Sequence, residues 1–215
     1  MAKITYYTHD NKKHTIEVVV DRFKVRDDYH AAVDQTALIR PSGYDILSQL
    51  YGHMMYCDPT KRLIEPLSWP WPDEHLILAK TRLKTQTHRH LAQLQWPFDS
   101  AFLQDLGGVV DQGKQALLSK DREAFASSIN RYRQRLVQQG FVASDAHDLM
   151  KALSSVGEIT AFKGCGAGSA DVVLLMVPAA HHAQLMSRLK RYFISYQSVT
   201  SFQTPGVMVE HQIGR

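Results

Sequence analysis

The sequence of 215 residues contains little cysteine, no long apolar run and no dense block of one charge. Cys57 and Cys165 could form at most one disulfide, and a chain of this size does not need one, so we expect free thiols. The longest apolar run, residues 172–180, has about half the length of a bilayer span, and we expect no membrane helix. The N-terminal residues lack the apolar stretch of a secretory signal, so we expect a cytoplasmic protein.

The charge is modestly positive, with 25 Lys+Arg against 21 Asp+Glu and a pI near 9.0. The excess lies in residues 108–215, which carry 12 basic and 8 acidic side chains, whereas residues 1–107 carry 13 of each. This surplus suits an anionic ligand such as a phosphate ester, and it suits an unspecialised basic surface as well. No Lys/Arg run is long enough for a nucleic-acid-binding arm.

Periodicity indicates strands and then a helix in the first third of the chain. The β-branched run 16–20 and the alternating segment 23–28 predict strands. A turn at residues 41–43 precedes residues 44–51, whose apolar side chains share one helical face, and Gly52 is placed to end this helix.

The proline-rich segment 66–72 is our expected domain boundary, which separates residues 1–65 from residues 66–215. Beyond it, residues 74–80 predict a buried strand, and a short helix capped by Thr87 is expected to run through Leu94. Three longer helices are predicted next. Their expected caps are Ser100, Asp121 and Ser144, and the expected stops of the last two are Gly140 and Gly157.

The C-terminal third predicts strands at 158–163, 171–177 and 207–213, with a helix that begins at Pro178 and has Leu185, Met186, Leu189, Tyr192 and Phe193 on one face. Strands and helices in this order predict an α+β sandwich of the ferredoxin-like type.

Two segments carry residues suited to chemistry. In the loop of residues 164–169, glycines permit positive φ and close approach, so successive amides could hold an oxyanion, although a plain strand-to-strand turn explains them too. This loop lacks the Lys-Ser/Thr pair of a P-loop. Asp45 lies in the first turn of a predicted helix, whose dipole favours an ionised carboxylate, and it is equally explained as an N-terminal capping acid.

These motifs and their order resemble the GHMP kinases, the superfamily that includes galactokinase, homoserine kinase, mevalonate kinase and phosphomevalonate kinase. The resemblance rests on Pro-Ser-Gly-Tyr-Asp at 41–45, Thr-Arg-Leu-Lys-Thr-Gln-Thr at 81–87, Lys-Gly-Cys-Gly-Ala-Gly at 163–168 and Gly-Val-Met-Val at 206–209. It extends over residues 41–213 and implies the C-terminal domain of a GHMP kinase at 66–215, preceded by a truncated remnant of the N-terminal domain at 1–65.

The resemblance also implies roles for individual residues. Asp45 would be the catalytic acid that orients the acceptor hydroxyl. The phosphorylatable substrate would be mevalonate or phosphomevalonate, and ATP with Mg would be the cofactor. The substrate would be bound by Ser42, Gly43, Arg82, Lys84 and Thr87. The nucleotide phosphates would be bound by Lys163, Gly164, Gly166, Ala167, Gly168 and Ser169.

The sequence also departs from the family pattern. The family's Pro-x-x-x-Gly-Leu-Gly-Ser-Ser-Ala phosphate loop occurs nowhere, and Ser169 and Ala170 stand where glycines are usual. Phosphoryl transfer depends on positioning and on cancelling charge at the transferred group. We therefore expect negligible kinase activity from this chain alone, and activity only when a separate chain supplies the missing half.

Other functions remain open beside the kinase component. One is a non-catalytic relic that binds a partner or forms a homo-oligomer. Another is a basic ferredoxin-like RNA-binding protein, which is disfavoured because no paired aromatics match the RNP pattern. We expect no membrane or nucleic-acid partner. His88 and His90 flank Arg89 without further metal-ligand spacing, so no metal site is expected from the residues themselves.

Overall fold

The computed structural model describes residues 2–7, 12–18, 21–32, 43–58, 60–83, 99–166 and 171–199. The chain divides into two compact units, which we describe separately. The first comprises Met1–Ser68 and Phe202–Arg215, and the second comprises Trp69–Ser201, so they divide within the proline-rich segment. In the part of the chain that is described, no helix has the length and apolar character needed to cross a membrane.

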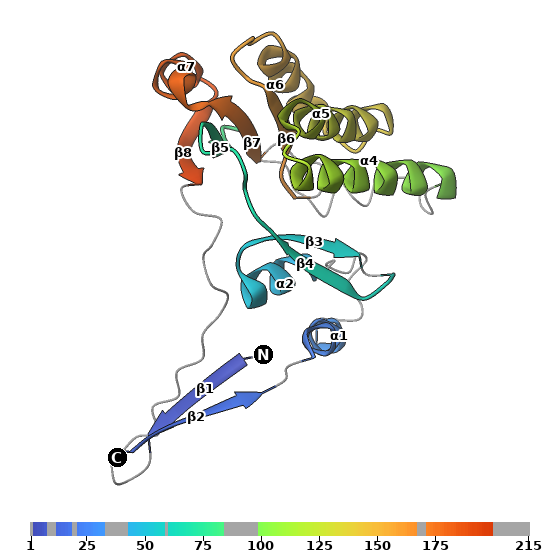
Figure 1. Ribbon diagram of the computed structural model, residues 1–215. Helices are drawn as coiled ribbons and strands as arrows, with labels where there is room; N and C mark the ends of the chain where they lie inside the picture. Colours follow the sequence, from blue (N-terminus) through green and yellow to red (C-terminus); the bar gives the residue numbers. More distant parts are fainter. Residues whose placement is uncertain are drawn as a thin grey trace. The chain divides into compact units, whose positions relative to one another are not determined.

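The first unit contains two antiparallel hairpins and two short helices (Figure 1). One hairpin pairs Ala2 with Val18 and Tyr7 with Lys13, and the other pairs Met54 with Leu67. The elements in chain order are β1 Ala2–Tyr7, β2 Lys13–Val18, α1 Arg22–Ala32, α2 Tyr44–Tyr51, β3 Met54–Asp58 and β4 Leu63–Leu67.

Residues 23–28 form part of helix α1, so the predicted strand there is wrong. The apolar and charged residues alternate over only a few positions, and Phe23 is the one fully buried side chain of the helix among those described. Lys24 and Asp28 form an ion pair at 2.7 Å with i, i+4 spacing, which suits a helix and not a strand. The hairpin of β3 and β4 was not predicted.

Helix α2 begins and ends as predicted. Gly43 precedes it in the left-handed conformation with φ 74°, and the Gly52 amide donates to the Ser48 carbonyl to close its last turn. Leu47 is completely buried and anchors the helix in the first unit.

The second unit is built on a four-stranded antiparallel sheet in the order β6-β7-β5-β8. Strand β7 lies between β5 and β6, so the connection from β5 to β6 crosses over it, as in a ferredoxin-like sandwich. The predicted α+β class is therefore confirmed. The strands are β5 Glu74–Thr81, β6 Ala161–Gly164, β7 Val172–Pro178 and β8 Phe193–Val199.

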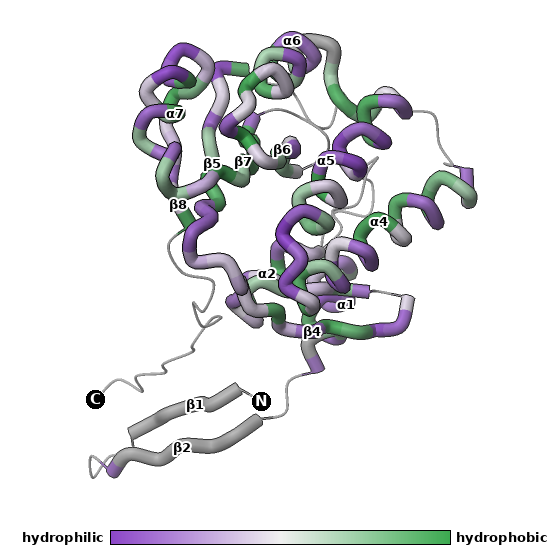
Figure 2. The backbone as a smooth tube through the Cα atoms, turned by 45° about the horizontal axis from the view of Figure 1, so that its top comes forward, coloured by the Kyte–Doolittle hydropathy of each residue, from purple (hydrophilic) through white to green (hydrophobic). Residues whose placement is uncertain are grey.

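Helices α6 and α7 pack on one face of this sheet and enclose the main core. Alternate residues of the two central strands point into it, as period-2 patterning requires, and Figure 2 shows β5 and β7 in hydrophobic colours. The core includes Ile77, Ala79, Val173, Leu175, Leu149, Leu153 and Leu185. The helices are α4 Ser100–Leu118, α5 Arg122–Gln138, α6 Ser144–Ser154 and α7 His182–Leu189, the last preceded by the 3-10 turn Ala179–His181.

The proline-rich segment is tied to the second unit by aromatic packing. The Trp69 and Trp71 rings meet edge to face with centroids 5.0 Å apart, and Phe125 of α5 lies 5.3 Å from Trp71. The Trp71 indole also donates to the Lys120 carbonyl oxygen at 3.2 Å. These contacts hold the start of β5 against the α4–α5 turn.

The helix caps agree with the sequence only in part. Asp121 caps α5 by accepting from the Ala124 amide at 3.0 Å, and Gly140 follows that helix with φ 72°, both as predicted. The cap of α4 is Asp99 rather than Ser100, because the Asp99 carboxylate accepts from the Ala101 amide. Helix α6 is preceded by Ala143 without a side-chain cap, so the predicted Ser144 cap is wrong.

The predicted C-terminal helix is too long. Helix α7 ends at Leu189, and Phe193 begins the edge strand β8 instead of continuing the helical face. The predicted strand at 207–213 and the helix expected after Thr87 lie outside the described residues.

Candidate functional site

Asp45 lies in the first turn of α2 with its side chain exposed. The N-cap of the helix is Gly43, which makes no side-chain capping bond, and Asp45 is the acid of the first turn, so its explanation as an acid that stabilises the helix N-terminus stays open. Among the described residues, no hydrogen bond or ion pair engages the Asp45 carboxylate. An exposed side chain at this position is accessible to a ligand.

Gly43 places this helix close to α1. A Cβ built on Gly43 would lie 2.8 Å from Cγ of Arg26 and 2.9 Å from Nε2 of His30. The Arg26 guanidinium lies 5.9 Å from the centre of the Tyr44 ring. Both the positive φ and the close approach of α1 therefore require glycine next to the turn that carries Asp45.

In the second unit, the candidate phosphate loop joins the antiparallel strands β6 and β7. The Cys165 amide donates to the Val172 carbonyl at 2.8 Å, so the hairpin pairing continues one residue past β6. Gly166 has φ 76°, and a Cβ there would meet nothing within 4 Å. Glycine at 166 is thus favoured by the positive φ and not by the close approach of a neighbouring atom.

Lys163 is the cationic group nearest this loop in sequence, and it is half-buried on β6. Its ammonium lies 5.9 Å from the centre of the Tyr132 ring of α5. Burial raises the pKa of the Cys165 thiol, and the positive charge of Lys163 partly opposes that shift. The Lys163 charge therefore acts on the Cys165 thiol at the start of the loop.

The sheet brings Arg82 to the same end of the unit as this loop. Gly164 pairs with Val173, and the Thr81 amide donates to the Asp171 carbonyl at 2.9 Å, so the ends of β6 and β5 flank the start of β7. The Arg82 Nε, however, donates to the Arg191 carbonyl at 3.1 Å. Arg82 thus holds the α7–β8 turn, a structural role that the sequence did not reveal.

Thr81, the first threonine of the 81–87 motif, is also engaged structurally. Its side chain is buried, and its hydroxyl accepts from the Leu83 amide at 3.1 Å. This bond ends strand β5 with a local turn.

The predicted site residues are distributed over both units. Asp45 and Gly43 belong to the first, while Arg82, Lys163, Gly164 and Gly166 belong to one end of the sheet in the second. Ser42, Lys84, Thr87, Ala167, Gly168 and Ser169 lie outside the described residues. A single cleft shared by Asp45 and the loop therefore stays a prediction.

Metal-binding side chains do not cluster in the described part of the chain, where no three of His, Cys, Asp or Glu could hold one ion. The left-handed Gly166 and the neighbouring Lys163 fit part of a phosphate cradle. The described residues alone do not supply a set of ligands for Mg.

Solved structures share this fold. L. major mevalonate kinase, solved in complex with R-mevalonate, aligns with a TM-score of 0.61 at 16% identity over 83% of this chain and 58% of that chain. Lactococcus lactis galactokinase, complexed with galactose, aligns with a TM-score of 0.61 at 9% identity over 84% and 60%. Mevalonate diphosphate decarboxylase from Staphylococcus aureus aligns with a TM-score of 0.51 at 13% identity, over 98% of this chain and 82% of that chain. No protein-family model and no curated protein sequence matches.

These structures belong to the GHMP kinase superfamily, so the resemblance predicted from the motifs is confirmed at the level of the fold. The chain has an α+β fold of the GHMP kinase type. At identities of 9–16% this likeness concerns the fold alone. The chain spans 58% of the mevalonate kinase and 60% of the galactokinase with which it aligns.

Proposed function

We propose that this chain is a component of a GHMP-type small-molecule kinase, which transfers a phosphoryl group from ATP to a substrate hydroxyl. The observation that carries the proposal is the fold shared with mevalonate kinase and galactokinase, together with an exposed Asp45 at the start of α2 that has no hydrogen-bond or ion-pair partner among the described residues. The expected Pro-x-x-x-Gly-Leu-Gly-Ser-Ser-Ala loop would come from outside these 215 residues.

Asp45 would accept or orient the proton of the acceptor hydroxyl, a role that suits an ionised carboxylate within hydrogen-bond reach of the substrate. Residues 163–169 would bind nucleotide phosphates through backbone amides and the Lys163 ammonium. Bound ATP with Mg would supply the phosphoryl group and neutralise its developing charge.

The finer assignment of substrate is mevalonate or phosphomevalonate. It rests on the Ser-Gly-x-Asp sequence around Asp45, which resembles that branch of the superfamily. The L. major structure holding R-mevalonate supports a substrate of this class without selecting between the two.

Calorimetric titration with MgATP tests the proposal, with and without the polypeptide encoded beside this one. We expect no turnover from the chain alone. On mixing we expect nucleotide binding and the conversion of ATP to ADP, with transfer of the phosphoryl group to mevalonate or phosphomevalonate. In the active mixture, Asp45→Asn should lower kcat by at least about 100-fold, the usual range for loss of a general base, with little effect on MgATP binding. Asp28→Asn, an exposed acid on α1, is the matched control. Unchanged turnover in Asp45→Asn would contradict the assigned role.

A non-catalytic, partner-binding subunit is the second candidate, and α4 supplies its supporting observation. Leu103, Val110 and Leu118 are 51%, 43% and 56% exposed on that helix. A partner that covers these side chains would remove apolar surface from water. Complex formation without any MgATP binding would favour this function over the kinase component.

A further inference from the structure

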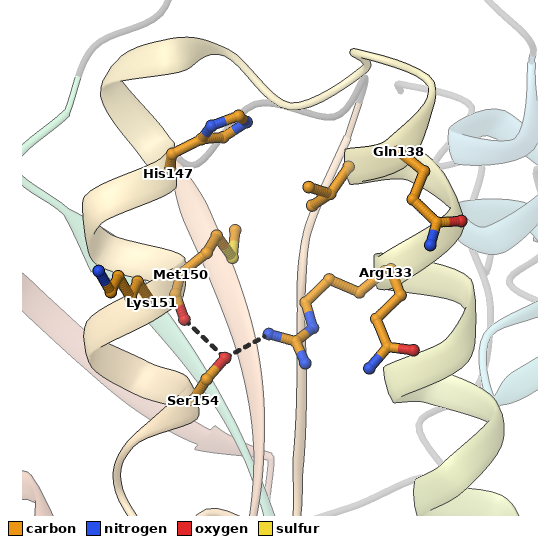
Figure 3. A pocket seen from close by; sticks show the side chains of 8 residues that line it. Arg133, Gln138, His147, Met150, Lys151 and Ser154 are labelled. Carbon is orange, nitrogen blue, oxygen red and sulfur yellow. Dashed lines mark hydrogen bonds between the residues drawn. The ribbon is translucent and has the colours of Figure 1, made fainter.

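A groove between α5 and α6 lies apart from the candidate phosphate loop and carries an excess of cationic groups. Its volume is about 450 Å³, within the range of about 300–1,000 Å³ that is typical of small-ligand sites. Arg133 of α5 and His147 and Lys151 of α6 line it, and no Asp or Glu is among its lining residues. Figure 3 shows the Arg133 side chain reaching from α5 toward α6, while Lys151 lies on α6 with its amino end pointing away from Arg133.

The Arg133 guanidinium is held in place by neutral partners. It stacks on the Phe162 ring with its central carbon 3.7 Å from the ring centre, and NH1 donates to the Ser154 hydroxyl at 2.9 Å. NH2 lies 3.5 Å from Oδ1 of Asn130, at the outer limit of a hydrogen bond. Ser154 in turn donates to the Met150 carbonyl at 2.8 Å (Figure 3).

No described carboxylate balances this charge. Nε of Arg133 is buried without a hydrogen-bond partner among the described residues, and burial lowers the pKa of the guanidinium. Of the other arginines of α5, Arg122 pairs with Asp73 at 3.0 Å and Arg135 pairs with Asp105 at 2.7 Å, whereas Arg131 donates to the neutral Oε1 of Gln112 at 2.6 Å. A half-buried cation without a counter-charge is costly, and a bound anion relieves that cost.

The groove also offers apolar surface beside the charge. Val137 of α5 and Met150 of α6 line it together with the cationic groups. A planar guanidinium matches the oxygens of a carboxylate or phosphate, and a nearby ammonium adds a flexible second contact. The lining therefore suits an oxyanion attached to a short aliphatic body.

We propose that the α5–α6 groove binds a small organic oxyanion, a carboxylate or phosphate ester, with Arg133 as the anchoring cation and Lys151 as the second contact. This site is independent of the proposed kinase function, because it uses neither Asp45 nor residues 163–169.

NMR titration of the isotope-labelled full chain tests this site, with inorganic phosphate, glycerol 3-phosphate and glutarate as probes and glycerol as the neutral control. We expect saturable shifts of α5 and α6 amides with at least one oxyanion and none with glycerol. The dissociation constant should rise by at least about tenfold in Arg133→Gln and in Lys151→Glu, since each removes a charge-assisted contact. Arg131→Gln and Lys190→Glu, which change the charge at residues that do not line the groove, should bind like the wild type.

Lys151→Glu decides the question even if Arg133→Gln fails to fold, because Lys151 is exposed. It should also raise the melting temperature relative to Lys190→Glu, since the new carboxylate supplies the missing counter-charge. The proposal is overturned if no oxyanion gives saturable shifts in α5 and α6. It is equally overturned if Lys151→Glu leaves the affinity unchanged, or if phosphate shifts only residues near 163–166. The last result would leave the proposed nucleotide loop intact.

Discussion

Glu74 and Arg122 form an ion pair in which only one partner is buried. Oε1 of Glu74 lies 3.3 Å from NH1 of Arg122, and the two side chains are 2% and 45% exposed. Oε2 of Glu74 has no hydrogen-bond partner among the described residues. Burial raises the pKa of the Glu74 carboxyl, and the attraction of Arg122 offsets only part of that shift. The ion pair with Arg122 thus offsets only part of the cost of burying this carboxylate at the start of β5.

Glu74→Gln should make the second unit more stable at neutral pH. Because the pKa of Glu74 is higher in the folded than in the unfolded chain, the protonated side chain stabilises the fold at pH values below the ordinary pKa of 4.5. This stabilisation is lost as the pH rises through the raised folded-state pKa. Glutamine keeps the shape without the buried charge, so we expect a gain of about 1 kcal/mol at pH 7 that disappears near pH 4. Urea unfolding at both pH values measures it. Glu123→Gln, an exposed acid of α5, should show no such pH-dependent gain.

Elements whose apolar residues recur at a regular spacing, or that carry capping residues, were predictable from the sequence. Elements that are mostly exposed were not. Asp121 and Gly140 bound α5, and the apolar run of β7 is fully buried on one face and at least half-buried on the other, so both elements are evident from local residues. Strand β8 was missed because most of its residues are exposed at a sheet edge, while Tyr192 and Phe193 extend the apolar spacing of α7. Short alternating runs such as 23–28 do not distinguish a strand from a helix.

The roles assigned to the candidate site residues stay predictions, and the contacts that these residues make could not be predicted from the sequence. The order of the motifs predicted the fold, since each motif carries a local backbone demand such as the positive φ of Gly43 and Gly166. The attachment of Arg82 to the Arg191 carbonyl depends on residues more than a hundred positions apart, and no local pattern encodes it. The α5–α6 groove could not be predicted for the same reason. In the sequence, Arg133 is indistinguishable from an ordinary cation on a helix surface.

Gly43→Ala should destabilise the first unit by about 2–3 kcal/mol, since strain at positive φ adds to the clash with Arg26 and His30. Gly140→Ala is the matched control in the second unit. It has a similar φ of 72° but nothing within 4 Å of a new Cβ, so about 1 kcal/mol of backbone strain alone is expected. Amide hydrogen exchange, which resolves α2 from α5, measures both. Equal losses would mean that the close approach of α1 contributes nothing.

Asn130 of α5 fastens that helix to the edge strand β6. Its Nδ2 donates to the Thr160 carbonyl at 3.2 Å, and its Oδ1 accepts from the Phe162 amide at 3.4 Å. Asn130→Ala removes both partners and leaves two backbone groups unpaired, which should cost about 1–3 kcal/mol in urea unfolding. Ser127→Ala, at an exposed position of the same helix, should change stability by no more than about 0.5 kcal/mol. A loss no larger than this control would contradict the bridging role.

Cys165 provides a chemical probe of the candidate phosphate loop. Burial raises the pKa of its thiol and the Lys163 charge lowers it. Only the thiolate attacks iodoacetamide, so the folded protein should react more slowly at pH 8 than the urea-unfolded chain, with a rate that rises with pH.

Lys163→Met should slow the reaction of Cys165 further. Loss of the positive charge raises the thiol pKa again, which lowers the thiolate fraction at pH 8 and therefore the reaction rate. Mass spectrometry of a Cys57→Ser background isolates the reaction at Cys165, and Lys190→Met serves as a control that removes a distant ammonium. A rate in Lys163→Met equal to that of the control would mean that the ammonium does not act on the thiol. That result would contradict the electrostatic contact between Lys163 and Cys165.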